Sequence, residues 1–172
     1  MIVDCHTHMS YVVGDAEVSD YLFGTQTVDS CIVLATADGS SEEVNERLSQ
    51  YVRRHEEKMI GFAAVEPTQD DIRVKSIAVL RGKLGLKGVV LHCANCGFHP
   101  AHSRAMQFYE AAKELGLPVF FHNSDSPLKS DGVLDYAQPV LLDEVARTFG
   151  DLKIVIGSMG APFVEQTLAM VS

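Results

Sequence analysis

Short apolar runs alternate with amphipathic stretches along the whole chain. The apolar runs are continuous rather than interrupted at every second residue, which predicts strands buried on both faces, as in a parallel sheet. The first expected strand opens at Ile2 and Val3. The other expected strands cover residues 31–35, 60–65, 88–92, 117–121 and 152–156. The pattern therefore predicts six strands.

Stretches with helical spacing of apolar residues separate these strands. Ser40 and Ser41, with Glu43 in the first turn, predict the N-terminus of one helix. Gly116 and Pro118 are typical of the end of another. The expected helices cover residues 16–23 (a weak pattern), 41–57, 70–82, 101–115, 139–149 and 162–170.

Repeated strand–helix units with buried strands predict an α/β fold whose parallel strands are joined by right-handed crossovers. Six βα units can form an open doubly wound sheet or part of a (β/α) barrel of the TIM type, and in both the function lies at the carboxyl ends of the strands. No glycine-rich turn follows the first strand, which argues against a dinucleotide-binding sheet. Histidines end several strands that are not neighbours, and their convergence requires a strongly curved sheet. We therefore expect a single domain over residues 1–172 that is an incomplete barrel.

Composition narrows the possible partners. The chain has 172 residues, 47% of them hydrophobic, and a formal net charge of −9 with no basic cluster. This balance argues against binding to nucleic acid or to an anionic membrane surface. No apolar run approaches the length of a membrane-spanning helix, and the N-terminus does not resemble a signal peptide, so we expect a cytoplasmic protein. The four cysteines are expected to be reduced thiols or metal ligands.

The segment Met1–His8 carries the strongest chemical signal. His6 and His8 are two residues apart at the end of a strand, so their imidazoles point to the same side. They are half of a zinc or iron site, although paired surface histidines are the alternative. His122 ends the fifth strand and completes a set of three, the number of protein ligands in several catalytic zinc sites. An ion held there would acidify a bound water. Asp4 is interpreted as a local hydrogen-bond acceptor.

The segment 92–102 offers a competing metal site. Cys93, Cys96, His99 and His102 have the residue types of a small structural zinc site at short spacing. Pro100 would have to lie between the last two ligands, and no second CxxC pair supports the site. The alternative is a substrate-facing loop that contains thiols.

Four stretches together resemble the amidohydrolase-2 family, a TIM-barrel branch of metal-dependent hydrolases and decarboxylases. They lie in the order and at the spacing of that family, and they are residues 2–8, 85–92, 108–122 and 139–162. The resemblance implies a metal-dependent hydrolase that acts on a small organic amide, lactone or acid. It leaves open a non-oxidative decarboxylase, or a relative that keeps the fold and has lost turnover.

The resemblance also implies roles for individual residues. His6, His8 and His122 would bind one divalent metal ion, with zinc expected, and His92 would lie beside the small-molecule substrate. Lys87 begins the fourth strand instead of ending it, so it does not match the lysine that bridges two metals in related enzymes.

Two departures from the family pattern affect the expected activity. Ser158 stands where the sixth strand of the family ends in a catalytic histidine, and serine cannot shuttle protons near neutral pH as imidazole does. The aspartate of the eighth strand has no counterpart, because the chain covers about the first two-thirds of a family member. If residue 172 is the end of the protein, the first and sixth strands keep open edges, and we expect a homo-oligomer. The other explanation is a longer natural protein.

Overall fold

The computed structural model describes residues 1–8, 23–122 and 132–171. Its six strands form one sheet in which strand order follows chain order and every pairing is parallel. The strands are β1 (Val3–His8), β2 (Ser30–Leu34), β3 (Met59–Ala64), β4 (Gly88–Leu91), β5 (Val119–Phe121) and β6 (Ile154–Ile156). The predicted α/β fold with six parallel strands is confirmed.

Helices follow the strands along the described chain. The α-helices are α2 (Ser41–Arg54), α3 (Val74–Gly82), α4 (Ser103–Glu114), α5 (Asp143–Thr148) and α6 (Val164–Val171). Short 3-10 helices cover Thr25–Thr27, Leu134–Ala137 and Pro139–Leu142, and Gly157–Gly160 forms a turn after β6. The weak helix expected at 16–23 falls, apart from its last residue, outside the described residues. No helix in the described part of the chain has both the length and the apolar character needed to cross a membrane.

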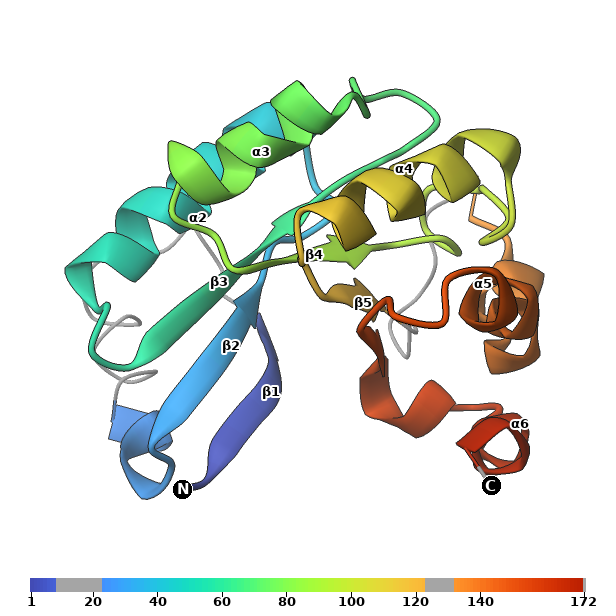
Figure 1. The fold of residues 1–172 in the computed structure, drawn as a ribbon. Coiled ribbons are helices and arrows are strands. Elements are labelled where there is room, and N and C mark those ends of the chain that lie inside the picture. Colours follow the sequence, from blue (N-terminus) through green and yellow to red (C-terminus); the bar gives the residue numbers. More distant parts are fainter. Residues whose placement is uncertain (9–22, 123–131, 172) are drawn as a thin grey trace.

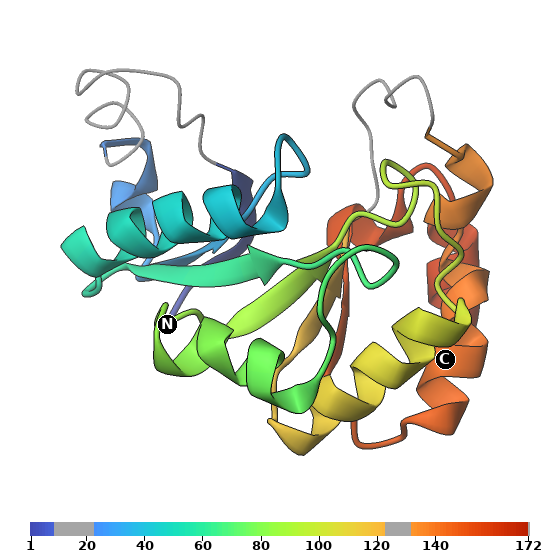
Figure 2. The same cartoon turned by 90° about the horizontal axis from the view of Figure 1, so that it is seen from above.

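The sheet is curled into a half-barrel. Figure 1 shows β1 and β6 at its two ends, with the helices on the outer side of the curl. Figure 2 shows from above that α3 and α4 run along this outer side. Because all strands are parallel, their carboxyl ends lie at one rim, and the residues that follow them gather there. The expected incomplete barrel is therefore observed.

The observed helix boundaries differ from the expected ones where side chains compete for backbone groups. The helix expected from Asp70 begins at Val74 instead. Oδ2 of Asp70 accepts a hydrogen bond from the backbone N–H of Glu66 at 2.7 Å, and Oδ1 of Asp71 accepts one from the N–H of Arg73 at 3.1 Å. These local bonds stabilise turns in place of the first helical turn.

Two other helices also depart from expectation at their ends. The helix expected over 139–149 is divided into a 3-10 turn that starts at Pro139 and the α-helix α5. The helix expected to reach 57 ends at Arg54, and the carbonyl of His55 then accepts hydrogen bonds from the N–H groups of Lys58 and Met59. At the other end of α2, Oγ of Ser40 accepts a bond from the N–H of Glu43 at 3.3 Å, so the predicted cap is confirmed.

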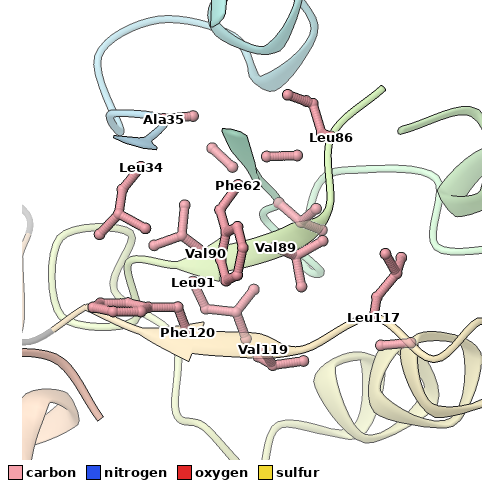
Figure 3. Packing of buried hydrophobic residues seen from close by; sticks show 14 of the residues in the cluster. Leu34, Ala35, Phe62, Leu86, Val89, Val90, Leu91, Leu117, Val119 and Phe120 are labelled. Carbon is pink, nitrogen blue, oxygen red and sulfur yellow. The ribbon is translucent and has the colours of Figure 1, made fainter. Parts of the chain in front are cut away.

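Buried apolar side chains hold the sheet in this shape. Leu34, Phe62, Val90 and Phe120, from four adjacent strands, are each at most 4% exposed, and Figure 3 shows them within the same core. Full burial of each such side chain contributes about 1.5–3 kcal/mol. The ring of Phe62 covers Gly88, where an added Cβ would come within 2.5 Å of it. This packing sets the strand ends that carry the histidines.

Candidate metal centre

His6 and His8 both lie on β1, as the sequence predicts. The pairing of β1 with β2 shifts register between Asp4 and Thr7, so the strand is irregular at this point. Oδ1 of Asp4 accepts a hydrogen bond from the backbone N–H of His6 at 3.1 Å within this irregular stretch. The interpretation of Asp4 as a local acceptor is thus confirmed. His6 lies within this irregular stretch and His8 directly after it, and such irregularities re-aim the side chains they carry.

His122 directly follows the last residue of β5 and brings a third imidazole to the same point. Nε2 of His8 lies 2.9 Å from Nε2 of His122 and 3.3 Å from Nε2 of His6. One ring nitrogen from each of the three lies within 4.8 Å of the others. Among the described residues, this is the one group of three or more potential ligands so placed. The expected triad therefore forms.

The spacing of these nitrogens fits a bound divalent ion. Zinc binds histidine nitrogen at about 2.0–2.1 Å, which places two tetrahedral ligands about 3.3 Å apart. The observed separations of 2.9 and 3.3 Å are close to that value. The donor set of three imidazoles suits zinc, copper, iron or nickel. The three histidines could thus hold one divalent metal ion.

The environment of His122 keeps its imidazole neutral. Its pKa is lowered from 6.5 to about 2, first by burial and then by the proximity of His92, His8 and His6. A metal ion requires the neutral form, because protonation occupies the lone pair that would bind it. An ion could therefore bind His122 without first displacing a proton.

His92 lies beside the triad at the end of β4. It is 5% exposed, and its ring centroid lies 4.7 Å from that of His122. Nε2 of His92 is 2.9 Å from the carbonyl oxygen of Ala35, which can only accept. Nε2 must therefore carry a proton, and Nδ1 is the basic nitrogen when His92 is neutral.

Ser158 reaches the triad from the turn after β6. Its Oγ lies 3.2 Å from Nδ1 of His6. If Nε2 of His6 held a metal ion, Nδ1 would carry the proton and its N–H would donate a hydrogen bond to Oγ of Ser158. Ser158 has φ 47° and Met159 has φ 54°, so two consecutive residues other than glycine adopt the left-handed conformation. Such a backbone is costly and is found mainly at functional sites.

The competing zinc site does not form. Nδ1 of His99 accepts a hydrogen bond from the N–H of Ala101 at 3.0 Å, and Nδ1 of His102 accepts one from the N–H of Arg104 at the start of α4. Cys93 is 4% exposed, and burial, with Cys96 nearby, raises the pKa of its thiol far above the usual range. The zinc hypothesis for this segment is wrong, because among the described residues these side chains do not bring three ligand atoms close enough to share one ion.

A cavity of about 740 Å³ opens over the triad. The four histidines and Ser158 line it, together with residues that sequence reasoning did not single out, namely Asp38, Asn95 and Phe120. Asp38 and Asn95 follow β2 and β4, so their position after a strand's carboxyl end was the signal that could have found them. Asn95 belongs to segment 92–102, which therefore borders the cavity as the substrate-loop alternative predicts.

Residues 3–172 match the amidohydrolase family. A comparison with curated proteins found no match.

Several solved structures share the fold. A probable 2-pyrone-4,6-dicarboxylic acid hydrolase from Acinetobacter baumannii has a TM-score of 0.65 and 14% identity, over 99% of this chain and 66% of its own. The 5-carboxyvanillate decarboxylase of Sphingomonas paucimobilis has a TM-score of 0.68 and 17% identity, and the match covers 92% of this chain and 68% of the decarboxylase. The 5-carboxyvanillate decarboxylase of Novosphingobium aromaticivorans, complexed with manganese, has a TM-score of 0.65 and 18% identity. This match covers 91% of this chain and 52% of the decarboxylase. The chain thus spans about half to two-thirds of their lengths.

Proposed function

The chain belongs to the amidohydrolase family, and on this premise we propose that it is a metal-dependent hydrolase of a small organic amide, lactone or acid. The observation that carries the proposal is the convergence of the Nε2 atoms of His6, His8 and His122 at separations of 2.9 and 3.3 Å. Three histidines with further ligand positions open are a common arrangement in hydrolytic zinc sites. Zinc is the proposed ion.

The residues around this ion would have different roles. His6, His8 and His122 would hold it, and Ser158 would orient His6 by accepting a hydrogen bond from its Nδ1–H group. A bound divalent ion lowers the pKa of its water, which then ionises near neutral pH. The ion can also polarise the substrate carbonyl. His92, fixed through Nε2 by the carbonyl of Ala35, would exchange a proton with the substrate at Nδ1.

Decarboxylation is the second candidate, because two of the structural neighbours are decarboxylases. In that reaction the ion would hold a substrate carboxylate, and His92 would protonate the carbanion that forms when carbon dioxide leaves. The presence of Ser158 in place of an imidazole supports a third candidate, a relative that keeps the metal ion without turnover.

Metal analysis of the full chain tests the proposal. We expect the purified protein to bind one zinc ion, and we expect that saturation with zinc raises its midpoint of thermal unfolding, because the ion binds the folded state alone. The variant His122→Ala should lose both effects. His55→Gln is the matched control, because His55 lies outside the triad, beside Tyr51 on α2.

Activity assays then separate the candidates. The zinc-loaded chain should hydrolyse members of a panel of amides and lactones, and His6→Ala should abolish this turnover. Release of carbon dioxide from aromatic acids would favour the decarboxylase. If the wild-type chain binds no metal ion and His6→Ala changes neither stability nor turnover, the hydrolase proposal is wrong.

A further inference from the structure

The charge of the cavity limits what it can bind. Asp38 is the one formally charged side chain among the described lining residues, and neither lysine nor arginine is among them. A carboxylate that enters a cavity loses hydration, and without a cation this loss is not compensated. The metal ion proposed above can neutralise one carboxylate. A second one would face Asp38.

The described lysine and arginine side chains do not line the cavity. Six of them bond to backbone carbonyls or carboxylates that do not line the cavity; these six are Arg53, Lys58, Arg73, Arg81, Arg104 and Arg147. The charge of the described lining residues therefore disfavours anions.

Asn95 indicates which group a ligand should carry. Its Oδ1 atom is buried and has no hydrogen-bond partner within the described residues, while its side chain lines the cavity. An acceptor that is buried without a donor destabilises the protein, and native structures rarely leave one unexplained. A ligand N–H or O–H group would satisfy this oxygen.

Apolar side chains provide the remaining wall. Phe120, Ile156 and Met159 line the cavity on the side of β5 and β6. Phe120 also packs edge-on against His6, with ring centroids 5.1 Å apart. A flat apolar ring fits beside such a wall.

We propose that the cavity selects an uncharged amide with an apolar ring, whose carbonyl faces the triad and whose N–H group donates to Oδ1 of Asn95, and that it rejects dicarboxylates. Asn95 is then a specificity-determining residue, and Asp38 opposes additional negative charge. The inference rests on the proposed function, since the proposed metal ion would hold the carbonyl. It also favours hydrolysis over decarboxylation for this chain.

Three probes test the proposal on the zinc-loaded full chain by isothermal titration calorimetry. They are benzohydroxamic acid, its N-methyl derivative, which lacks the N–H donor, and 4-carboxybenzohydroxamic acid, which adds one carboxylate. Loss of one hydrogen bond to a buried acceptor should weaken the N-methyl probe about tenfold. The carboxylated probe should bind at least about tenfold more weakly than the parent. Ala37→Arg adds a cation to the cavity lining. It should reduce the difference in affinity between the carboxylated probe and the parent.

Variants at Asn95 test whether this residue causes the weaker binding of the N-methyl probe. In Asn95→Leu, which has a similar size and no acceptor, the parent and N-methyl probes should bind equally. Asn95→Asp keeps an acceptor oxygen and should restore the difference. Zinc affinity should stay unchanged in both variants.

The outcomes distinguish failure of this inference from failure of the proposed function. If the carboxylated probe binds as tightly as the parent, or if Asn95→Leu leaves the N-methyl difference intact, the inference is overturned while the metal site stands. If the wild-type chain binds no zinc, the proposed function and the inference both fail.

Discussion

Nε2 of His8 lies 2.9 Å from Nε2 of His122, although 114 residues separate the two in sequence. Their strands, β1 and β5, do not pair; β2, β3 and β4 lie between them in the sheet. In a flat sheet, four strand spacings of about 4.8 Å would hold the two strands far apart. The curl of the half-barrel brings them together, so the candidate metal site depends on the core that maintains this curvature.

Acid should destabilise the metal-free protein. The pKa of His122 is 6.5 in the unfolded reference and about 2 in the folded chain, so between these values the unfolded state binds more protons. The free energy of unfolding therefore falls as the pH falls below the unfolded pKa. We expect a loss of about 1–2 kcal/mol between about pH 7.5 and about pH 5, measured by urea denaturation in the presence of a chelator.

The control for this effect removes the titrating group. His122→Leu should flatten the dependence on pH, while His55→Gln should keep it. An unfolding free energy in the wild-type chain that does not change over this range would contradict the assignment to His122.

Replacement of Ser158 by glycine should weaken metal binding without destabilising the fold. Glycine adopts the φ of 47° at this position without strain, so the free energy of unfolding should stay equal or rise by about 0.5–1 kcal/mol. Loss of the hydroxyl that accepts from Nδ1 of His6 should lower zinc affinity about tenfold, as measured by competition with a chromogenic chelator.

Met159→Gly is the matched variant for this comparison. It relieves the neighbouring φ of 54° and leaves the bond from His6 to Ser158 in place. Its zinc affinity should equal that of the wild-type chain. Equal zinc affinity in Ser158→Gly would show that the hydroxyl does not orient His6.

The cysteines should differ sharply in reactivity. Cys5 is exposed, whereas Cys93 is 4% exposed and burial raises the pKa of its thiol. Because the thiolate is the reactive form, iodoacetamide near neutral pH should label Cys5 and spare Cys93 until the chain is unfolded. Mass spectrometry of peptides from native and urea-treated protein measures this. Rapid native labelling of Cys93 would contradict its place in the core.

We also expect copies of the chain to associate. Apolar side chains are exposed next to β1 and at the end of α6, with Ile2 61% and Val171 72% exposed. Burial of such surface is the main driving force for association. Light scattering coupled to gel filtration should give a mass above 18.8 kDa that falls in the double variant Ile2→Lys, Val171→Lys. A monomer at every concentration would contradict this expectation.

The sequence by itself determined the order of elements and the side of the sheet that carries chemistry. Continuous apolar runs predict buried parallel strands, and the carboxyl ends of parallel strands share one rim. His6, His8, His92 and His122 could therefore be assigned to that rim from local patterns alone. The spacing of two between His6 and His8 also predicts their common direction, because strand periodicity is a local property.

The tertiary structure decided which of these groups meet. The separation of His8 from His122 depends on sheet curvature, and the approach of Ser158 to His6 depends on two residues with positive φ that no glycine signals. The start of α3 and the place of Asn95 depend on side-chain bonds and loop paths, which local periodicity does not encode. Long-range geometry of this kind arises from packing of the whole core, so it appears only once the chain has folded.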